Sequence, residues 1–161
     1  MIGSGSAFQR ELCAMLVRGR FFGDLPEEQT SALARYVQAY AAAPRTVVFR
    51  EGEAGSFMCL LLDGSAKIYK QDHHFGTKCI GSVDAGKTLG EMALIDGEPR
   101  SATCICDAPS TLIMLSRENF VRIVREEPAL SVNILLKLVS LMSRRLRVTS
   151  GQLVDYLEAR G

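Results

Sequence analysis

The stretch "LGEMALIDGEPRSAT", residues 89–103, is too short for a long helix and too irregular for a strand. Its centre, "EMALID", has the length of about one and a half helical turns, and Gly97 then supplies a residue that tolerates a positive φ. Because so short a helix buries little apolar surface, its useful part is the N-terminus, where unpaired N–H groups favour an anion. Gly90 stands at that end and lets a ligand approach the backbone.

Two charged residues flank this short helix. Arg100 follows Glu91 by nine residues and stands directly after the rigid Pro99. A guanidinium can hold a phosphate through two parallel hydrogen bonds, whereas a carboxylate repels a phosphate and accepts instead from a hydroxyl. The pattern therefore predicts a site for a phosphorylated sugar, with the phosphate on Arg100 and a ribose hydroxyl on Glu91. The alternative is an ordinary surface loop in which Glu91 and Arg100 form an ion pair.

The composition is typical of one globular domain without a strong charge bias. The chain has 161 residues, of which 47% are hydrophobic and 23% are charged, and its formal net charge is +1. This length allows a core of its own, and the charge argues against a protein that coats a polyanion. The opening residues lack the apolar segment of a secretory signal, and the longest apolar run, residues 130–142, is too short to cross a bilayer. We expect a cytoplasmic protein that does not bind membranes.

Cysteine and histidine residues give no metal-site pattern. The five cysteines form no C-x-x-C pair and are Cys13, Cys59, Cys79, Cys104 and Cys106. An iron–sulfur cluster would need four closely spaced thiolates, so buried reduced thiols are the better interpretation. The adjacent His73 and His74 fall in a polar turn, where they are predicted to be solvated rather than to bind a metal.

Residues 7–45 are predicted to form an N-terminal helical segment. Two stretches in it, "FQRELCAMLV" and "PEEQTSALARYVQAY", carry apolar residues at the three-to-four spacing of a helix, up to about residue 43. Asp24 and Pro26 are typical of a helix start, and Pro44 is typical of a helix end.

Residues 46–116 are predicted to form a β-roll. Short segments rich in Val, Ile, Leu, Thr and aromatic residues alternate with turn sequences such as "DGS" and "DAGK". Their spacing of roughly 8–12 residues is typical of a sandwich or barrel with jelly-roll connections. The segments are 46–49, 57–62, 66–70, 78–83, 102–106 and 111–115.

Residues 117–161 are predicted to be helical again, with Ser116 as the N-cap of the first helix and Asn119 three residues on. A second helix is predicted from Ala129 to about Glu158. It carries one apolar seam at three-to-four spacing, made of Leu135, Leu138, Met142, Leu146, Thr149, Leu153 and Tyr156. A seam of this length is typical of a helix that packs on a partner helix, which predicts a homodimer. The alternative is a helix folded back on its own domain.

The sequence resembles the cyclic-nucleotide-binding domain family over nearly its whole length. "LGEMALIDGEPRSAT", with the cassette proper at 89–102, is similar to the family's phosphate-binding cassette, Phe/Leu-Gly-Glu-x-Ala-Leu followed by Pro-Arg-x-Ala. "VVFREGEAGSFMCLLLDGSAKIY" and "FFGDLPEEQTSAL" resemble its first strands and its N-terminal helical segment. "RRLRVTS", residues 144–150, is similar to the long helix of the bacterial catabolite activator (Crp/Fnr-like) branch. The resemblance implies an α+β fold, namely an eight-stranded antiparallel β-roll or jelly-roll (double-stranded β-helix) with N-terminal helices and a long C-terminal helix.

The resemblance also implies roles for individual residues. Glu91 would accept the ribose 2′-OH, and Arg100, helped by Ser101 and the N–H groups after Gly90, would bind the cyclic phosphate. Arg145 would reach the nucleotide from the long helix. The full implied ligand site comprises Ile80, Leu89, Gly90, Glu91, Met92, Arg100, Ser101, Ala102, Arg145, Thr149 and Ser150. Within that set, the walls of the base and sugar pocket would be Ile80, Leu89 and Met92.

The function implied is that of a regulatory sensor that signals through movement or dimerisation of the long helix. Its ligand would be cAMP, with cGMP as the second candidate and no further cofactor. In this family a threonine after the cassette arginine is associated with cGMP, whereas Ser101 matches the activator branch, which uses it on the phosphate. The preference for cAMP is therefore expected from a hydroxyl of Thr149 or Ser150, of the same chain or of the opposite one, that accepts from the adenine amino group. No helix-turn-helix follows the long helix in this sequence, so we expect no direct DNA binding by this chain.

Two other functions stay open at this stage. One is a degenerate Crp-like interaction module that no longer binds nucleotide, against which the presence of Glu91 and Arg100 argues. The other is an enzyme of cupin type, which would need several converging histidines or a nucleophile–base pair. Because neither pattern is visible in the sequence, we expect no enzyme.

Overall fold

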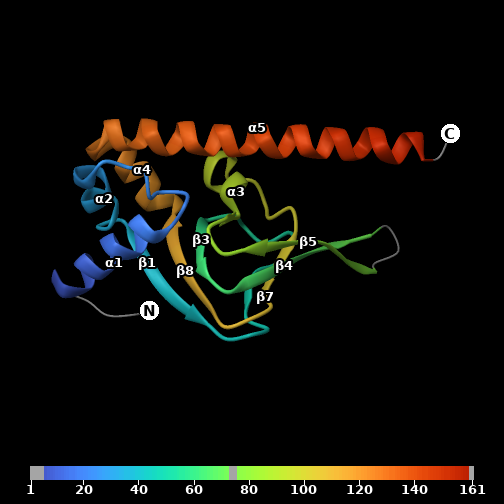
Figure 1. Ribbon diagram of the computed structural model, residues 1–161, viewed down its shortest axis with the longest axis horizontal. Coiled ribbons are helices and arrows are strands. Elements are labelled where there is room, and N and C mark those ends of the chain that lie inside the picture. The colour runs from blue at the N-terminus through green and yellow to red at the C-terminus, as the bar shows by residue number, and fades with distance from the viewer. Residues whose placement is uncertain (1–5, 73–75, 160–161) are drawn as a thin grey trace.

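Two four-stranded antiparallel sheets form a β-roll with helices at both chain ends in the computed structural model, which describes residues 6–72 and 76–159 (Figure 1). The elements are α1 (Ser6–Arg18), α2 (Glu27–Leu33), β1 (Val37–Ala42), β2 (Val47–Phe49), β3 (Phe57–Asp63), β4 (Ser65–Gln71), β5 (Thr77–Asp84), β6 (Thr88–Leu89), α3 (Glu91–Asp96), β7 (Thr103–Cys106), β8 (Ser110–Ser116), α4 (Arg117–Glu126) and α5 (Pro128–Glu158). The predicted α+β class and β-roll are confirmed. The predicted pair His73 and His74 lies outside the described residues.

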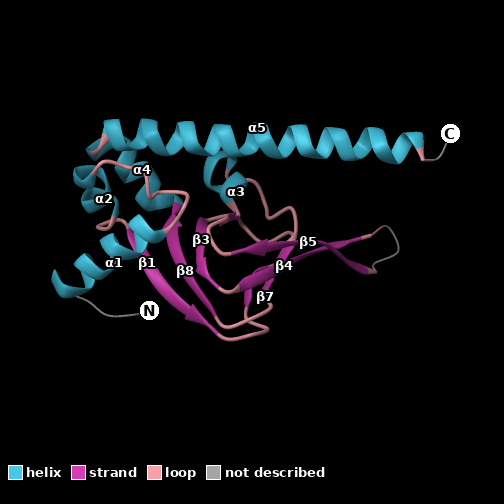
Figure 2. Cartoon of the chain, viewed as in Figure 1, coloured by secondary structure: helices cyan, strands magenta, loops and turns pink. Residues whose placement is uncertain are grey.

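The strand order separates two hydrophobic cores. One sheet has the order β1-β8-β3-β6 and the other the order β2-β7-β4-β5. The first core joins the β1-β8-β3 side to the helices, and the second lies between the two sheets. Cys59, Cys104 and Cys106 are buried in the second core as free thiols, which confirms the interpretation for these three. It is wrong for Cys79, which is exposed on the projecting strand β5, and Cys13 is only half-buried. Figure 2 shows the helices gathered on one side of the roll.

The prediction of a helix up to residue 43 is wrong, because α2 ends at Leu33 and residues 37–42 form β1. β1 pairs with β8 in an unbroken antiparallel register from Val37–Leu115 to Ala42–Ser110. Its first four residues alternate between buried and half-buried side chains, the period of a strand rather than a helix. The two-residue strand β6 was also missed, and its pairing with β3 sets Leu89 beside Cys59.

The helical signals near the C-terminus are confirmed. Ser116 Oγ accepts a hydrogen bond of 3.1 Å from the Asn119 N–H and so caps α4. α5 begins at Pro128 and continues to Glu158. It runs over α4 and α3 and then beyond the body of the roll (Figure 1). No helix within the described residues combines the length and the apolar character needed to cross a membrane.

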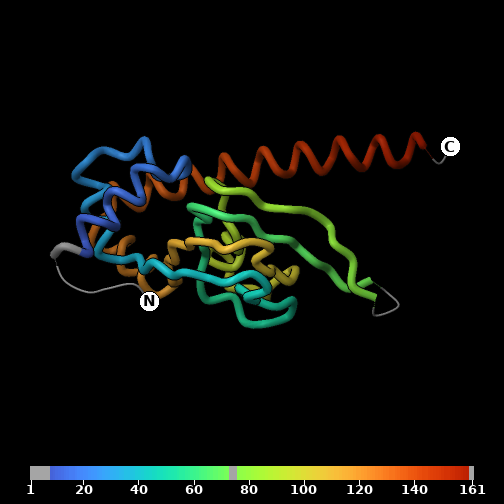
Figure 3. Tube along the Cα trace, turned by 60° about the horizontal axis from the view of Figure 1, so that its bottom comes forward, coloured from blue at the N-terminus to red at the C-terminus, as the bar shows by residue number. Residues whose placement is uncertain are grey.

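The predicted apolar seam of α5 divides into two parts. Leu138 is fully buried in the first core, and Leu135 is partly buried against it, so this part packs on its own domain. Leu146 is 68% exposed, and Leu153 and Tyr156 are exposed as well. Figure 3 shows that this second part of α5 lies apart from the roll. The paired strands β4 and β5 also extend outward from the body of the roll.

Candidate ligand-binding site

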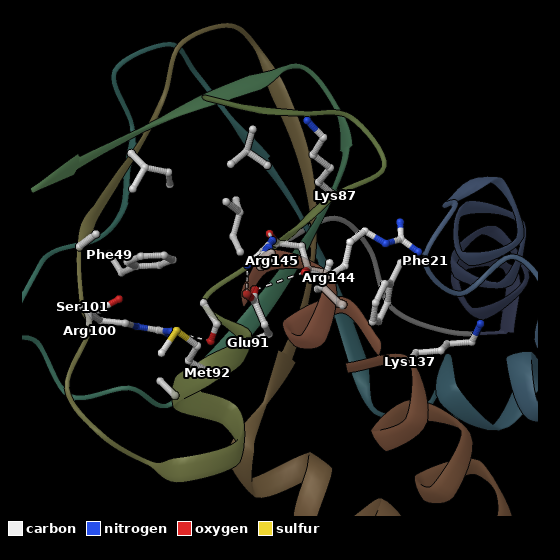
Figure 4. A pocket seen from close by; sticks show the side chains of 18 of the residues that line it. Phe21, Phe49, Lys87, Glu91, Met92, Arg100, Ser101, Lys137, Arg144 and Arg145 are labelled. Atoms are coloured by element: carbon white, nitrogen blue, oxygen red, sulfur yellow. Dashed lines mark hydrogen bonds and ion pairs between the residues drawn. The ribbon is translucent and has the colours of Figure 1, made fainter. Parts of the chain in front are cut away.

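A cavity of about 1280 Å³ lies between the β-roll, α3 and the middle of α5. Its walls come from segments far apart in the sequence, including β5, β6, the loop after α3 and residues 136–148 of α5. In Figure 4 the side chains of Glu91 and Arg145 meet in the centre, and Arg100 lies to one side next to Phe49. The short helix α3 thus lies at the wall of this cavity.

Two glycines bound α3, and the one at its start is required by the packing. Gly90 has φ +70° and Gly97 has φ +72°, both in the left-handed region that favours glycine. A Cβ atom at Gly90 would lie 2.3 Å from Arg100 Nη1 and 3.1 Å from the Phe49 ring. The absence of a side chain at Gly90 therefore lets the guanidinium lie directly against the N-terminal end of α3.

Arg100 is a buried cation held by carbonyls and aromatic rings. It is 4% exposed, and it donates to the Gly90 carbonyl at 3.0 Å and to the Phe57 carbonyl at 2.7 Å. Its guanidinium carbon lies 4.3 Å from the ring centre of Phe49 and 4.4 Å from that of Phe57. Desolvation by burial lowers the pKa of Arg100 from its ordinary value.

Arg100 keeps free hydrogen-bonding capacity. No carboxylate in the described part of the chain forms an ion pair with it, and its Nε is buried without a hydrogen-bond partner. A buried charge without a counterion is costly, and a buried unpaired donor adds to the cost. The site is therefore chemically matched to an anion that would accept from this guanidinium.

Glu91 has a different set of partners. Its side chain is 2% exposed, one carboxylate oxygen pairs with Arg145, and the other accepts from Thr88 Oγ1 at 3.2 Å. Arg145 also donates to the Thr88 carbonyl at 3.1 Å, and desolvation lowers the pKa of Arg145. The alternative of a surface ion pair between Glu91 and Arg100 is wrong, because both are buried and each has other partners.

The structure brings together most of the predicted site residues. Those that line the cavity are Ile80, Leu89, Gly90, Glu91, Met92, Arg100, Ser101, Ala102 and Arg145. Ile80 and Met92 are exposed apolar side chains, so the cavity has open apolar surface next to its charges. Thr149 and Ser150 are exposed on α5 and do not line the cavity within one chain.

Three residues that shape the site were missed by the sequence analysis. Phe49 and Phe57 enclose the Arg100 guanidinium, and the buried Thr88 fixes both Glu91 and Arg145. Thr88 directly precedes the cassette, so its position next to the motif was the signal that could have identified it. The two phenylalanines lie more than forty residues before Arg100, and no local pattern connects them with it.

Residues 41–127 match the family model of the cyclic nucleotide-binding domain. The chain belongs to this family. It is 28% identical over 142 residues to the cyclic AMP receptor protein of Thermus thermophilus, an alignment that covers 87% of this chain and 63% of that protein. It is 33% identical over 129 residues to a cAMP-dependent protein kinase regulatory subunit of Hypocrea atroviridis, covering 73% of this chain and 28% of that protein. The chain thus spans less than two thirds of the length of either relative.

The structural comparison agrees with the family assignment. A crystal structure of a cyclic nucleotide-binding domain from Methylobacillus flagellatus KT superposes with a TM-score of 0.82 and 30% identity, covering 96% of this chain and 87% of that one. The catabolite activator protein of Thermus thermophilus shares the fold, with a TM-score of 0.74 and 24% identity over 86% of this chain and 63% of that one. Within the described residues, no group of three or more His, Cys, Asp or Glu side chains is placed to hold a metal ion.

Proposed function

We propose that this cyclic nucleotide-binding domain is a sensor for cAMP that signals through α5. The observation that carries the proposal is Arg100, a buried guanidinium with an unpaired Nε beside the N-terminal end of α3. A cyclic phosphate would accept from this guanidinium, from Ser101 and from the N–H groups that follow Gly90. No carboxylate of the cassette forms an ion pair with Arg100, and Glu91 pairs with Arg145 instead.

The sugar subsite is the buried carboxylate of Glu91. A ribose 2′-OH would donate to Glu91, which in this structure already accepts from Arg145 and Thr88. Because Arg145 belongs to α5, a ligand that engages Glu91 changes the partners available to that helix. Ligand binding and the position of α5 are then linked by the difference in contacts between the free and bound states.

The partner that we propose for α5 is a second copy of the same chain. Exposed apolar side chains follow one face of α5 at three, four or seven residue spacing and include Val132, Leu136, Val139, Leu146, Leu153 and Leu157. Because Thr149 and Ser150 do not line the cavity of their own chain, the residue that distinguishes adenine from guanine in such a dimer would be one of them supplied by the second copy. The cytoplasmic location and the absence of direct DNA binding stay predictions.

The test is calorimetric titration of the wild-type chain and of Arg100→Ala with cAMP and cGMP. Loss of a charge-assisted contact of about 2–4 kcal/mol lowers cAMP affinity roughly thirtyfold to a thousandfold. Arg50→Ala is the matched control, since Arg50 is exposed and lies outside the cavity. An Arg100→Ala variant that binds cAMP as tightly as the wild type would refute the site. A folded wild-type chain that binds neither nucleotide would favour the degenerate interaction module.

A further inference from the structure

The cavity extends well beyond the phosphate and sugar subsites. Its volume of about 1280 Å³ exceeds the roughly 300–1,000 Å³ typical of small-molecule pockets. On the side away from Arg100, its lining includes Arg20, Lys87 and Arg144, which we call the basic end. Figure 4 shows Arg100 on one side of the Glu91–Arg145 pair, and Phe21 and Lys87 on the other.

The basic end brings three separate segments together. Arg20 follows α1, Lys87 lies in the turn between β5 and β6, and Arg144 belongs to α5. The aliphatic part of Arg20 packs over the turn, because a Cβ atom at Gly86 would lie 3.2 Å from Arg20 Cδ. The three cations are therefore gathered by tertiary contacts and not by a basic run in the sequence.

Two of these cations lack a counterion. Lys87 pairs with Asp84 at 2.8 Å, and the neighbouring Lys137 pairs with Asp24. Neither Arg20 nor Arg144 forms an ion pair with any residue that the structure describes. The nearest buried carboxylate of the cavity, Glu91, already pairs with Arg145. Arg20 and Arg144 are therefore exposed side chains that line the cavity without a carboxylate partner in the described part of the chain.

We propose that the basic end is a second phosphate site, so that the cavity takes a ligand with two phosphate groups, such as a cyclic dinucleotide. Two guanidinium groups match the geometry and charge of a phosphate. The half-buried Phe21, which packs edge-to-face on Phe22, also lines this end and would supply an aromatic ring for a second base to stack on. The second site extends the nucleotide site at Arg100 and rests on that proposed function. The same chemistry fits a free phosphate ion bound beside cAMP.

The test is calorimetric titration with cAMP, cyclic di-AMP and inorganic phosphate at one ionic strength. The variant is Arg20→Ala/Arg144→Ala. The matched control, Arg18→Ala/Arg147→Ala, removes one arginine from α1 and one from α5, neither of which lines the cavity. The control therefore measures how much affinity is lost when two positive charges are removed outside the cavity. The melting temperature of each variant shows whether it is folded.

For a dinucleotide ligand, the variant binds cyclic di-AMP about tenfold or more weakly, cAMP within about twofold, and the control matches the wild type. For a free ion, the wild type binds inorganic phosphate in the presence of cAMP, and the variant loses this binding. Equal affinities of the variant and the wild type for cyclic di-AMP and phosphate overturn the second site. The second site is also overturned if the variant loses affinity for cAMP and cyclic di-AMP equally. It is overturned as well if the wild type binds neither cyclic di-AMP nor phosphate. If the wild type does not bind cAMP but binds cyclic di-AMP, and the variant loses that binding, the cAMP assignment is refuted and the second site is supported.

Discussion

Arg100 and Glu91 are both almost completely buried, and their surroundings make them different kinds of group. Arg100 is surrounded by ring faces and carbonyl oxygens, which orient a guanidinium without neutralising its charge. Glu91 is neutralised by Arg145 and oriented by Thr88, so it is a positioned hydrogen-bond acceptor. The first arrangement suits a phosphate, and the second suits a hydroxyl.

The sugar role of Glu91 predicts discrimination between cAMP and 2′-deoxy-cAMP. The wild type should bind 2′-deoxy-cAMP about tenfold more weakly, because one hydrogen bond to a charged acceptor is worth about 1.5–3 kcal/mol. Glu91→Gln should narrow this difference, since a neutral amide oxygen is a weaker acceptor than a carboxylate. Titration of both proteins with both nucleotides measures the effect. Equal affinity of the wild type for the two nucleotides would exclude Glu91 from the ribose site.

The buried and exposed cysteines are predicted to differ in how fast their thiols react with an alkylating reagent. Burial raises the pKa of the Cys59 and Cys104 thiols to about 12, so both stay protonated near pH 8 and lack the reactive thiolate. Cys79 is exposed and should react quickly with iodoacetamide in the native state, whereas Cys59 and Cys104 should react only after unfolding. Peptide mass spectrometry of labelled protein reads out each site, and Cys79→Ser is the control that removes the fast site. Fast native labelling of Cys59 would contradict the buried core.

At the scale of elements, α3 shows how six residues can build a binding site. The helix is bounded by glycines at φ +70° and +72°, and its first residue is Glu91. Its length leaves most of its N–H groups without a partner inside the helix. Its place at the cavity wall comes from Leu94, which is buried in the helical core, and from Gly90, which permits contact with Arg100.

Gly90, at the start of α3, can be compared with Gly52, which lies between β2 and β3, to separate the effect of backbone strain from that of contact with Arg100. Gly90→Ala and Gly52→Ala both place a side chain at positive φ, +70° and +81°, and each should cost about 1–2 kcal/mol of stability. Only the Gly90 variant places its Cβ against Arg100, since nothing lies within 4 Å at Gly52. We therefore expect Gly90→Ala alone to lose cAMP affinity, by about tenfold or more. Thermal melts and titration measure the two effects, and equal affinities of the two variants would show that the Gly90 contact is unimportant.

At the scale of the whole molecule, α5 extends from the candidate ligand cavity to an exposed apolar surface. Its first part is anchored in the helical core by Leu130, Ile134 and Leu138. Its middle lines the cavity and supplies Arg145, and its last part has no core of its own. In the proposed sensor, α5 would carry a change at Glu91 from the cavity to whatever covers its exposed face.

Dimerisation through α5 should be sensitive to Leu146. Leu146→Asp removes apolar burial on the order of 2 kcal/mol per chain and adds two charges to the dimer seam, so the dimer should dissociate at least about tenfold more readily. Val124→Asp is the matched control, because it places the same charge at another exposed apolar residue, which is 44% exposed and lies on α4 rather than α5. Light scattering across a concentration series gives the mass of each variant. A wild-type chain that stays monomeric at all concentrations would rule out this seam.

The sequence by itself determined the features whose signals are local. The helix "EMALID" between its glycines, the Ser116 cap and the long helix from residue 128 all depend on side chains within a few positions of one another. The same holds for most strands of the roll, whose apolar runs end in turn residues. The cassette motif placed Glu91 and Arg100 in one site for the same reason, since its residues are contiguous.

Only the tertiary structure decided the features that depend on distant partners. Residues 37–42 follow a helical stretch without a break signal, and they form a strand because β8 supplies a complete ladder of backbone partners. Glu91 pairs with Arg145 across 54 positions, and Arg100 bonds to the Phe57 carbonyl across 43. The basic end likewise forms only when α1, the turn at Gly86 and α5 come together. Local propensity carries no information on such contacts, because burial and long-range packing select them after the elements have formed.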